Sequence, residues 1–469
     1  MVLAENNNTL DAIVIGGGPG GYVCALKLAM LGKAVMLIEK DRVGGTCLNR
    51  GCIPTKALLQ SGELFTQMKA APEMGITAEG LKLDTERVNA RKQKVVDTLV
   101  QGVQGLLKAR KVQVIQGEAA FLSREIIGVT LPDGSVKELS APNIIIATGS
   151  RAAMPPIAGI DGKNVITSTE ALEVETLPKS LVVIGGGVIG MEIGTAYSDF
   201  GVKVYVLEAM PSILPGMDGE VVKEFTKHAA KKMDIHTSAL VKEIADTDDG
   251  QKRVVFESDG KPGEAEAEKV LVATGRVPAT DGLGLERAGV KTERGRVLVD
   301  DYYRTNAEGV YCIGDANGIC MLAHAASAQG IAVAESVAGA KCGIAQSIVP
   351  ACVYTDPEIA SAGLTEEQAG EQGIGYKTAK FPFRANGRSL VLGKTEGFVK
   401  IISGEKYNEI LGVHIVGPHA TELIAECALA MKLEACVEDI ANTIHAHPTV
   451  SESIMEAAEG LLGGSIHYL

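Results

Sequence analysis

The chain has 469 residues, of which 46% are hydrophobic, and its 45 Lys and Arg against 58 Asp and Glu leave a net charge of −13. This length predicts two to four domains, because single hydrophobic cores stop growing at about 250–300 residues. The acidic balance argues against a nucleic-acid-binding protein, which would need clustered basic residues for its phosphate contacts.

The N-terminal residues 1–11 are polar and lack the basic and then apolar pattern of a secretory signal. No stretch approaches the roughly 20 apolar residues that span a bilayer, so we expect a soluble, cytoplasmic protein. Nine cysteines occur without a Cys-x-x-Cys pair or a close Cys/His quartet, so we expect no metal site. Most are single and are expected to be buried small hydrophobic residues: Cys24, Cys312, Cys352, Cys427 and Cys436.

Residues 11–40 are predicted to fold as a strand, a Gly-rich turn, a helix and a second strand. The turn carries G-x-G-x-x-G at Gly16, Gly18 and Gly21, and Glu39 ends the second strand. The first glycine permits the tight turn, the second lets the backbone approach a pyrophosphate, and the third lets helix and strand pack closely. The helix N-terminus favours the pyrophosphate, and the glutamate can accept hydrogen bonds from ribose hydroxyls. The segment predicts a dinucleotide site, with a plain strand–turn–helix unit as the alternative.

The most informative segment is GGTCLNRGCIPTK at residues 44–56, in which four residues separate Cys47 from Cys52. Two of these four favour turns, and such a loop could bring the two Cα atoms within disulfide distance. Pro54 indicates a helix that starts just after Cys52, and a helix N-terminus favours the thiolate that exchanges disulfides or reduces a flavin. The alternative, two buried cysteines that do not react, stays open at this point.

Residues 52–110 are predicted to be helical and amphipathic. Residues 112–140 alternate as antiparallel strands do, around a turn at Asp133 and Gly134. An apolar strand then ends in Ala-Thr-Gly at 147–149, and the Pro- and Gly-bearing stretch 151–163 is a candidate domain boundary.

Residues 180–209 repeat the organisation of the first segment. G-x-G-x-x-G returns at Gly185, Gly187 and Gly190, and Glu208 follows the first of these by the same 23 residues that separate the corresponding pair in the first unit. Two such units predict two dinucleotides, or one working site and a relic; electron transfer from a bound flavin to a diffusible nicotinamide would need both. A carboxylate at Glu208 would repel a 2′-phosphate, which favours NAD over NADP.

The remainder of the chain contains two further patterns. Residues 251–272 alternate as antiparallel strands do and lead to a second Ala-Thr-Gly at 273–275, followed by a candidate boundary at 276–284. From about residue 350 an α+β domain is predicted. Its strand-like runs are 398–402 and 411–416, and its helical runs are 421–433 and 451–460.

Over essentially its whole length, the chain resembles the dihydrolipoamide dehydrogenases of the class I pyridine nucleotide–disulfide oxidoreductase family. Residues 44–56 are similar to that family's redox-active disulfide segment, and GVYCIGDA at 309–316 to its second FAD motif. HAHPTVSESIMEA at 445–457 is similar to its catalytic-base motif. The resemblance implies an α/β fold with two Rossmann-like domains and a C-terminal α+β dimerisation domain. The implied domains are 1–156 (FAD-binding), 157–280 (NAD-binding), 281–348 (central, completing the FAD site) and 349–469 (dimerisation).

The resemblance also implies roles for the catalytic residues. Cys47 would attack the substrate, and Cys52 would be the thiolate closest to the flavin. His447 would be the acid/base, supplied by the other subunit, with Glu452 holding its imidazole. An imidazole titrates near neutrality and a carboxylate partner would fix its tautomer, so the residue types suit these roles. His445 is the competing histidine, and a structural role is favoured for it.

For the cofactors, the resemblance places Asp315 on the FAD ribityl chain and Glu39 on the adenosine ribose. Lys56 and Glu192 match a lysine–glutamate pair beside the flavin ring. Further cofactor contacts are implied for Gly117, Thr148, Gly149, Ser150, Met321, Ala323, His324, Val241 and Gly275. Two positions depart from the family pattern: Arg50 stands where Val is usual and Thr55 where Ser is usual. The added cation of Arg50 is expected to favour the thiolate and so to stabilise the reduced dithiol.

The activity that the resemblance implies is the oxidation of protein-bound dihydrolipoyl groups by NAD⁺, through a Cys47–Cys52 disulfide and tightly bound FAD. The expected partners are a second copy of the chain and a lipoyl-bearing protein of a 2-oxo acid dehydrogenase or glycine cleavage complex. The main alternative is a glutathione reductase-like enzyme, which would typically use NADP. Mercuric reduction fits less well because the C-terminus has no cysteine pair. A non-catalytic flavoprotein is opposed by the intact Cys47, Cys52, His447 and Glu452.

Overall fold

The computed structural model describes residues 10–340 and 348–469, so residues 1–9 and 341–347, which belong to the expected FAD-binding and central domains, lie outside it. The described residues form two compact units. Unit 1 combines Met1–Ala57, Glu86–Ala153 and Gly275–Gln346, and unit 2 combines Leu58–Thr85, Met154–Thr274 and Ser347–Leu469. Parts of the expected FAD-binding and central domains thus share unit 1, and the expected four domain boundaries stay predictions.

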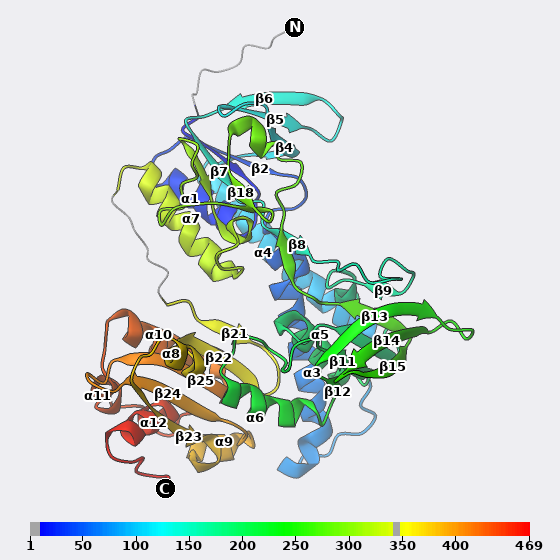
Figure 1. Cartoon of the computed structure of the whole chain (residues 1–469), viewed down its shortest axis with the longest axis vertical. Helices are drawn as coiled ribbons and strands as arrows, with labels where there is room; N and C mark the ends of the chain where they lie inside the picture. Colours follow the sequence, from blue (N-terminus) through cyan, green and yellow to red (C-terminus); the bar gives the residue numbers. More distant parts are fainter. Residues whose placement is uncertain (1–9, 341–347) are drawn as a thin grey trace. The chain divides into compact units, whose positions relative to one another are not determined.

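Unit 1 is built on a five-stranded parallel sheet (Figure 1). In order across the sheet its strands are β20 (Val310–Cys312), β7 (Asn143–Ile146), β1 (Ala12–Ile15), β2 (Val35–Glu39) and β3 (Gln113–Gln116). One face is covered by α1 (Pro19–Met30), α4 (Thr85–Ala109) and α7 (Ala323–Val337). The other packs against an antiparallel sheet of β4 (Glu118–Phe121), β5 (Ile126–Thr130) and β6 (Val136–Ser140). Burial on both faces explains why the central strands read as continuous apolar runs.

Helices and short elements complete the N-terminal half of the chain. The helices α2 (Gly45–Arg50) and α3 (Cys52–Ala70) follow β2, and the 3₁₀ turn η1 (Ala71–Met74) follows α3. The expectation of one helical stretch over 52–110 is therefore corrected, because residues 75–84 are not helical and α4 begins only at Thr85. Gly75 adopts φ 78°, a left-handed conformation that ends the helical run. The antiparallel strands expected within 112–140 are present only from β4 to β6, with the turn at Asp133 and Gly134, because β3 pairs with β2 in the parallel sheet.

Unit 2 contains a second parallel sheet, which confirms the internal repeat (Figure 1). In order its strands are β12 (Asp234–His236), β11 (Lys203–Leu207), β10 (Ser180–Ile184), β16 (Lys269–Val272) and β9 (Val165–Ile166). The helix α5 (Val188–Asp199) connects β10 to β11, and η2 (Glu170–Leu172) and α6 (Gly219–Ala229) lie outside this connection in the chain. An antiparallel sheet of β13 (Ala239–Asp246), β14 (Lys252–Ser258) and β15 (Lys261–Ala267) packs beside it.

The expectation for residues 251–272 is only partly correct. β14 and β15 pair in antiparallel fashion, but β16 joins the parallel sheet, where Val270 pairs with Val182. Local alternation could not reveal this, because the choice of partner strand depends on residues almost 90 positions away in the chain.

The C-terminal part of unit 2 is the expected α+β domain. Its antiparallel sheet runs β21 (Ala351–Val353), β22 (Glu358–Gly363), β25 (Ile410–Gly417), β24 (Phe398–Gly404) and β23 (Tyr376–Pro382). Its helices are α8 (Glu366–Glu371), α9 (Gly387–Leu392), α10 (Ala420–Lys432), α11 (Val437–Ala441) and α12 (Glu452–Leu462). Remaining short elements of unit 1 are β8 (Ser150–Ala152), β17 (Arg276–Pro278), η3 (Leu285–Ala288), β18 (Thr292–Glu293), β19 (Arg296–Val297) and η4 (Gly314–Asn317), and η5 (Phe383–Ala385) lies in unit 2.

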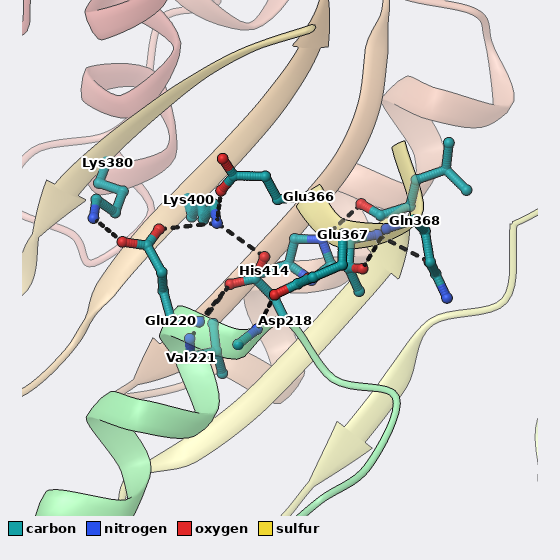
Figure 2. Close-up of polar contacts among 12 residues, drawn as sticks. Asp218, Glu220, Val221, Glu366, Glu367, Gln368, Lys380, Lys400 and His414 are labelled. Atoms are coloured by element: carbon teal, nitrogen blue, oxygen red, sulfur yellow. Dashed lines mark hydrogen bonds and ion pairs between the residues drawn. The ribbon is translucent and has the colours of Figure 1, made fainter. Parts of the chain in front are cut away.

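A buried ionic network joins α6 to the C-terminal sheet within unit 2 (Figure 2). Nζ of Lys400 lies 2.9 Å from Asp218, 2.9 Å from Glu220 and 2.6 Å from Glu366. Asp218 also caps α6 by accepting the N–H groups of Glu220 and Val221. Burial alone would lower the pKa of Lys400, but its hydrogen bonds to the three carboxylates raise it. Lys400 is therefore a permanent cation, and it ties the helix to the sheet.

Among residues 10–340 and 348–469, no helix is both long and apolar enough to cross a membrane. Within the same residues, no group of three or more His, Cys, Asp and Glu side chains is arranged to hold a metal ion.

Candidate functional site

The first Gly-rich turn has the geometry that a dinucleotide requires. Gly16 adopts φ 104°, and a Cβ there would lie 2.3 Å from the Ala147 carbonyl oxygen. A Cβ at Gly21 would lie 1.8 Å from the Gly16 oxygen, so only glycine allows α1 to pack on β1. At Gly18, by contrast, the nearest atom would be 3.9 Å away, so the space above the N-terminus of α1 is open. Gly16 and Gly21 are therefore required for the turn and for helix packing. Gly18 leaves room for a ligand to contact the protein backbone.

Glu39 lies at the end of β2, directly beside this turn. Its Oε2 accepts the Gly17 N–H at 2.7 Å, and its Oε1 accepts the Asp41 N–H at 2.8 Å. Its backbone oxygen accepts the N–H of Gly117, which brings that expected cofactor residue next to it. Burial raises the pKa of Glu39, while the Gly17 N–H opposes the rise. The carboxylate is thus in place for the hydroxyls of a ribose.

The end of β7 brings together the expected FAD residues of distant segments. Ser150 Oγ donates a hydrogen bond to Asp315, which lies in η4 after β20. The Thr148 hydroxyl is buried and has no partner within the described part of the chain. Gly149 has φ 72° and no atom within 4 Å of a Cβ built on it. An orphaned buried hydroxyl beside an open backbone is the signature of a site that a bound group completes, so these residues fit FAD.

The sequence reasoning missed one residue of this cluster, Arg276. Because β17 pairs with β8, its guanidinium reaches Ser150, with Nε 2.7 Å from Oγ and Nη2 2.7 Å from the backbone oxygen. Nε also lies 4.0 Å from Asp315. Burial lowers the pKa of Arg276, whereas Asp315 and Cys52 raise it. The only sequence signal was its position directly after the second Ala-Thr-Gly.

The second Gly-rich turn has a geometry that corresponds closely to that of the first. Gly185 has φ 109°, a Cβ at Gly190 would lie 2.0 Å from the Gly185 oxygen, and Gly187 has no atom within 4 Å of such a Cβ. Glu208 Oε2 accepts the Gly186 N–H at 2.6 Å, and Oε1 accepts the Met210 N–H at 2.7 Å. Both halves of the repeat therefore retain working geometry, which argues against one of them being a relic. Gly275, expected on the same cofactor, has φ 110° and open space at its Cβ position.

The two cysteines of the candidate redox pair are adjacent, but not in the way the sequence predicts. Cys47 lies in the short helix α2 rather than in a loop, and Cys52 is the first residue of α3. Gly51 makes the reversal possible, because a Cβ there would lie 2.9 Å from the Thr46 oxygen and 3.3 Å from Cα of Cys47. The Thr55 hydroxyl donates to the Gly51 oxygen at 2.6 Å and helps to hold the turn.

The two thiols interact directly. A hydrogen bond with the Cys52 side chain raises the pKa of Cys47, burial raises it further, and the charge of Lys56 opposes both effects. Arg50, expected to favour the thiolate, pairs instead with Asp41, and Lys56 is the cation that acts on Cys47. The predicted effect of Arg50 on the dithiol stays a prediction, and this geometry weakens its basis.

The side chains of His447 and Glu452 are in hydrogen-bond contact at the start of α12. His447 Nδ1 lies 2.8 Å from Glu452 Oε1, and Glu452 Oε2 accepts the Thr449 N–H at 2.8 Å. Burial alone would raise the pKa of Glu452, but the Thr449 N–H and His447 lower it. The His447 side chain is 78% exposed. His445 differs, because its side chain is 5% exposed and its Nε2 lies 2.8 Å from Glu426.

The other expected residues also lie within the described part of the chain. Met321 precedes α7, which begins with Ala323 and His324. Val241 lies on β13, whose first N–H binds the Glu208 oxygen. Lys56 belongs to unit 1 and Glu192 to unit 2, where Glu192 accepts the Tyr354 N–H at 2.9 Å. The Lys56–Glu192 pairing stays a prediction.

Comparison with known proteins places this geometry in a family. Residues 10–330 match the family model described as pyridine nucleotide-disulphide oxidoreductase, and residues 349–458 match the dimerisation domain of the same family. The chain belongs to the pyridine nucleotide-disulphide oxidoreductases. Members of this family use FAD and a pyridine nucleotide, in agreement with the two Gly-rich turns. The dimerisation domain supports a homodimer.

Relatives within the pyridine nucleotide-disulphide oxidoreductases are similar over the full length. The chain is 44% identical to the dihydrolipoyl dehydrogenase of Geobacillus stearothermophilus over 471 residues, which cover 100% of both chains. It is also 44% identical to a dihydrolipoyl dehydrogenase of Bacillus subtilis, covering 100% of this chain and 99% of the other. Among solved structures, LpdA from Mycobacterium tuberculosis matches with a TM-score of 0.89 and 31% identity over 96% of this chain and 100% of that chain. The HOCl-induced flavoprotein disulfide reductase RclA from Escherichia coli, as its Cu(II) complex, matches with a TM-score of 0.86 and 30% identity over 96% and 99%.

Proposed function

We propose that the chain is a dihydrolipoyl dehydrogenase that oxidises protein-bound dihydrolipoyl groups with NAD⁺. The observation that carries the proposal is the full-length identity with enzymes of that name, in a chain whose two interacting thiols and His–Glu pair are all present. The overall reaction converts a dihydrolipoyl dithiol and NAD⁺ to a lipoyl disulfide, NADH and one proton.

The reaction begins with the Cys47–Cys52 disulfide. His447, supplied by the other subunit of the dimer, takes the proton of a substrate thiol, and the resulting thiolate attacks Sγ of Cys47 and releases Cys52 as a thiolate. The second substrate thiol then attacks the substrate sulfur of the mixed disulfide, which forms the cyclic lipoyl disulfide and releases the Cys47 thiol. The enzyme is left with Cys47 and Cys52 as a dithiol. Thiolates are the reactive species in each exchange, so the reaction needs a base that can accept a thiol proton near neutral pH, as an imidazole does.

The residues of the chain hold the groups that this chemistry requires. Gly16, Gly18, Glu39, Ser150 and Asp315 would hold FAD. Gly187, Glu208 and Gly275 would hold NAD. Bound FAD would supply the two-electron transfer between the dithiol and NAD⁺. Glu452 keeps the His447 ring oriented, because its Oε1 lies 2.8 Å from the ring Nδ1.

Two features favour NAD⁺ and a lipoyl substrate over glutathione and NADP. Glu208 presents a carboxylate at the end of β11, where a 2′-phosphate would be repelled. The relatives with the highest identities given above carry the dihydrolipoyl dehydrogenase name. A lipoyl-bearing protein of a 2-oxo acid dehydrogenase or glycine cleavage complex would be the physiological partner. The cytoplasmic location stays a prediction.

The test is an anaerobic assay of the purified holoenzyme with two thiols and two nicotinamides. Dihydrolipoamide with NAD⁺ should give rapid NADH formation, and NADP⁺ should be a poor substitute. Alkylation followed by mass spectrometry should find Cys47 and Cys52 newly modified after dihydrolipoamide is added. If NADPH reduces glutathione disulfide rapidly through the enzyme, and dihydrolipoamide leaves Cys47 and Cys52 oxidised, the assignment is wrong.

A further inference from the structure

The C-terminal tail is held on α12 by one buried carboxylate. Oε2 of Glu456 accepts the N–H groups of Ile466 at 2.9 Å and His467 at 3.2 Å, and its Oε1 lies 2.6 Å from Nδ1 of His467. Ser465 Oγ donates to the Glu456 backbone oxygen at 2.8 Å. The Glu456 side chain is only 4% exposed. Residues 465–467 therefore wrap around Glu456 and satisfy both of its carboxylate oxygens.

Aromatic packing fixes the tail beyond this point. The Tyr468 hydroxyl accepts a hydrogen bond from Arg384 at 2.8 Å, and the same guanidinium lies over the Tyr468 ring. The ring also meets Phe381 of β23 edge to face, with centroids 6.3 Å apart. The tail is thus packed against η5 and β23 as well as α12, which gives it a defined position.

The arrangement around Glu456 repeats that around Glu452, one helical turn earlier. In each case Oε1 pairs with an imidazole Nδ1 and Oε2 accepts backbone N–H groups. Each imidazole is exposed, at 78% for His447 and 71% for His467. Side chains four residues apart on a helix are neighbours, so the two His–Glu pairs stand side by side on α12.

We propose that the His467–Glu456 pair positions the His447–Glu452 pair: it anchors the first turns of α12 and neutralises the carboxylate next to Glu452. His467 is then a positioning residue, which acts on the acid/base through Glu456 and Glu452. This inference rests on the proposed function for the role of His447.

The physical reason is that two neighbouring carboxylates on one helix repel each other unless each has a counterion. Glu456 is buried, and His467 is the one basic side chain paired with it in the described residues. Without His467 its charge would remain uncompensated beside Glu452. The added negative potential would hold the proton on His447 more tightly, and the loss of the tail contact would remove an anchor of α12 one turn from Glu452.

The charged groups around the two His–Glu pairs are consistent with an electrostatic coupling between the pairs. The hydrogen bond to Glu456 raises the pKa of His467, and Glu452 adds to the rise. The charges of His447 and His445 both lower the pKa of Glu452. From α10, Glu426 neutralises His445, and from η5 the guanidinium of Arg384 faces the tail through Tyr468. When His467 is substituted, only Glu456 loses its charged partner, and the other groups keep theirs.

The experiment compares His467→Ala with His467→Asn in the full-length holoenzyme. An asparagine amide can donate to Glu456 as Nδ1 does but carries no charge, so it separates anchoring from neutralisation. His467→Ala should lower kcat by about fivefold to tenfold and shift the acid limb of the pH profile upward by about half a pH unit. His467→Asn should recover most of kcat but keep the upward shift. The double variant Glu456→Gln/His467→Asn should return the limb to its wild-type position.

A second readout does not depend on the reaction. The titration of His447 can be followed by NMR in protein with labelled histidines, its signal assigned by its loss in His447→Gln, and it should move upward in His467→Asn. His228→Asn, which removes a similar His–Glu pair on α6, is the matched control and should leave the titration unchanged. An unaltered His447 titration and kcat in both His467 variants would overturn the proposal. If His467→Ala does not fold, the Asn and double variants still decide it. If the wild type does not oxidise dihydrolipoamide, the proposed function fails while the titration still tests the coupling.

Discussion

The guanidinium of Arg276 holds Ser150 at two points, through Oγ and through the backbone oxygen, both at 2.7 Å. Ser150 in turn hydrogen-bonds to Asp315, so a cation from β17 orients an acceptor in η4 through a serine of β8. Three segments that lie far apart in the sequence meet in this chain of contacts. It is the part of the expected FAD site that only the fold assembles.

Replacement of Arg276 by Met should weaken FAD binding. The variant removes the two hydrogen bonds that fix Ser150 and the cation near Asp315, and the loss of hydrogen bonds from a charged group should raise the Kd of FAD by about tenfold. Arg276→Lys keeps the charge but not the planar fork, so it should recover only part of the affinity. FAD titration of the apoprotein measures the effect. Arg151→Met, which removes an exposed arginine paired with Asp281, should bind FAD as the wild type does.

Two glycines of the second turn should respond differently to alanine. Gly190→Ala places a Cβ 2.0 Å from the Gly185 oxygen, so it should destabilise the protein and lower Tm whether or not nucleotide is present. At Gly187 the space is open, so Gly187→Ala should leave Tm of the nucleotide-free protein unchanged but raise the Kd of NADH. Differential scanning calorimetry and NADH titration separate the two effects. Equal losses of Tm would contradict the assigned roles.

The redox pair can be tested with a cysteine of similar exposure elsewhere. Cys47→Ser and Cys52→Ser should each lower dihydrolipoamide oxidation by at least about a thousandfold, because an alcohol cannot form the disulfide. Both variants should still transfer electrons from NADH to an artificial dye, since the nicotinamide site is untouched. Cys436→Ser is the control: Cys436 begins α11 as its N-cap, a position that serine also favours, and full activity is expected. Substantial turnover of dihydrolipoamide by either the Cys47→Ser or the Cys52→Ser variant would exclude a dithiol mechanism.

The ionic network around Lys400 predicts a pH-dependent contribution to stability. Lys400→Met would leave Asp218 buried without its cation and should cost about 3–5 kcal/mol in the free energy of unfolding. Burial alone would raise the pKa of Asp218, but its hydrogen bond to Lys400 lowers the pKa below the ordinary value. A group with a lowered pKa stabilises the fold above its unfolded pKa and loses that effect as the pH falls.

The difference between wild type and Lys400→Met should therefore be full near neutral pH and should shrink as the pH falls below about 4. Urea unfolding at a series of pH values checks this. Lys380→Met, which removes a half-exposed cation bound to Glu220, should cost no more than about 1 kcal/mol. A Lys400 variant as stable as the Lys380 variant would show that the buried network contributes little.

How far the sequence predicts the site depends on the range of the interactions involved. Gly16, Gly21 and Glu39 lie within one strand–turn–helix–strand unit, so local spacing sufficed to predict that they lie together. The strands of 251–272 illustrate the limit: β14 and β15 pair with each other, but β16 pairs with β10, which lies almost 90 residues earlier in the chain.

By itself, the sequence determined the two dinucleotide units, the position of the cysteine pair and the family motifs, because each depends on residue types at short, fixed spacings. Tertiary structure alone decided that Arg276 reaches Ser150, that Arg50 turns to Asp41 and that His467 of the tail contacts Glu456 of α12. These contacts join segments whose separation along the chain carries no periodic signal. They depend on which strands pair and which way side chains leave the backbone, and both follow only from the packed fold.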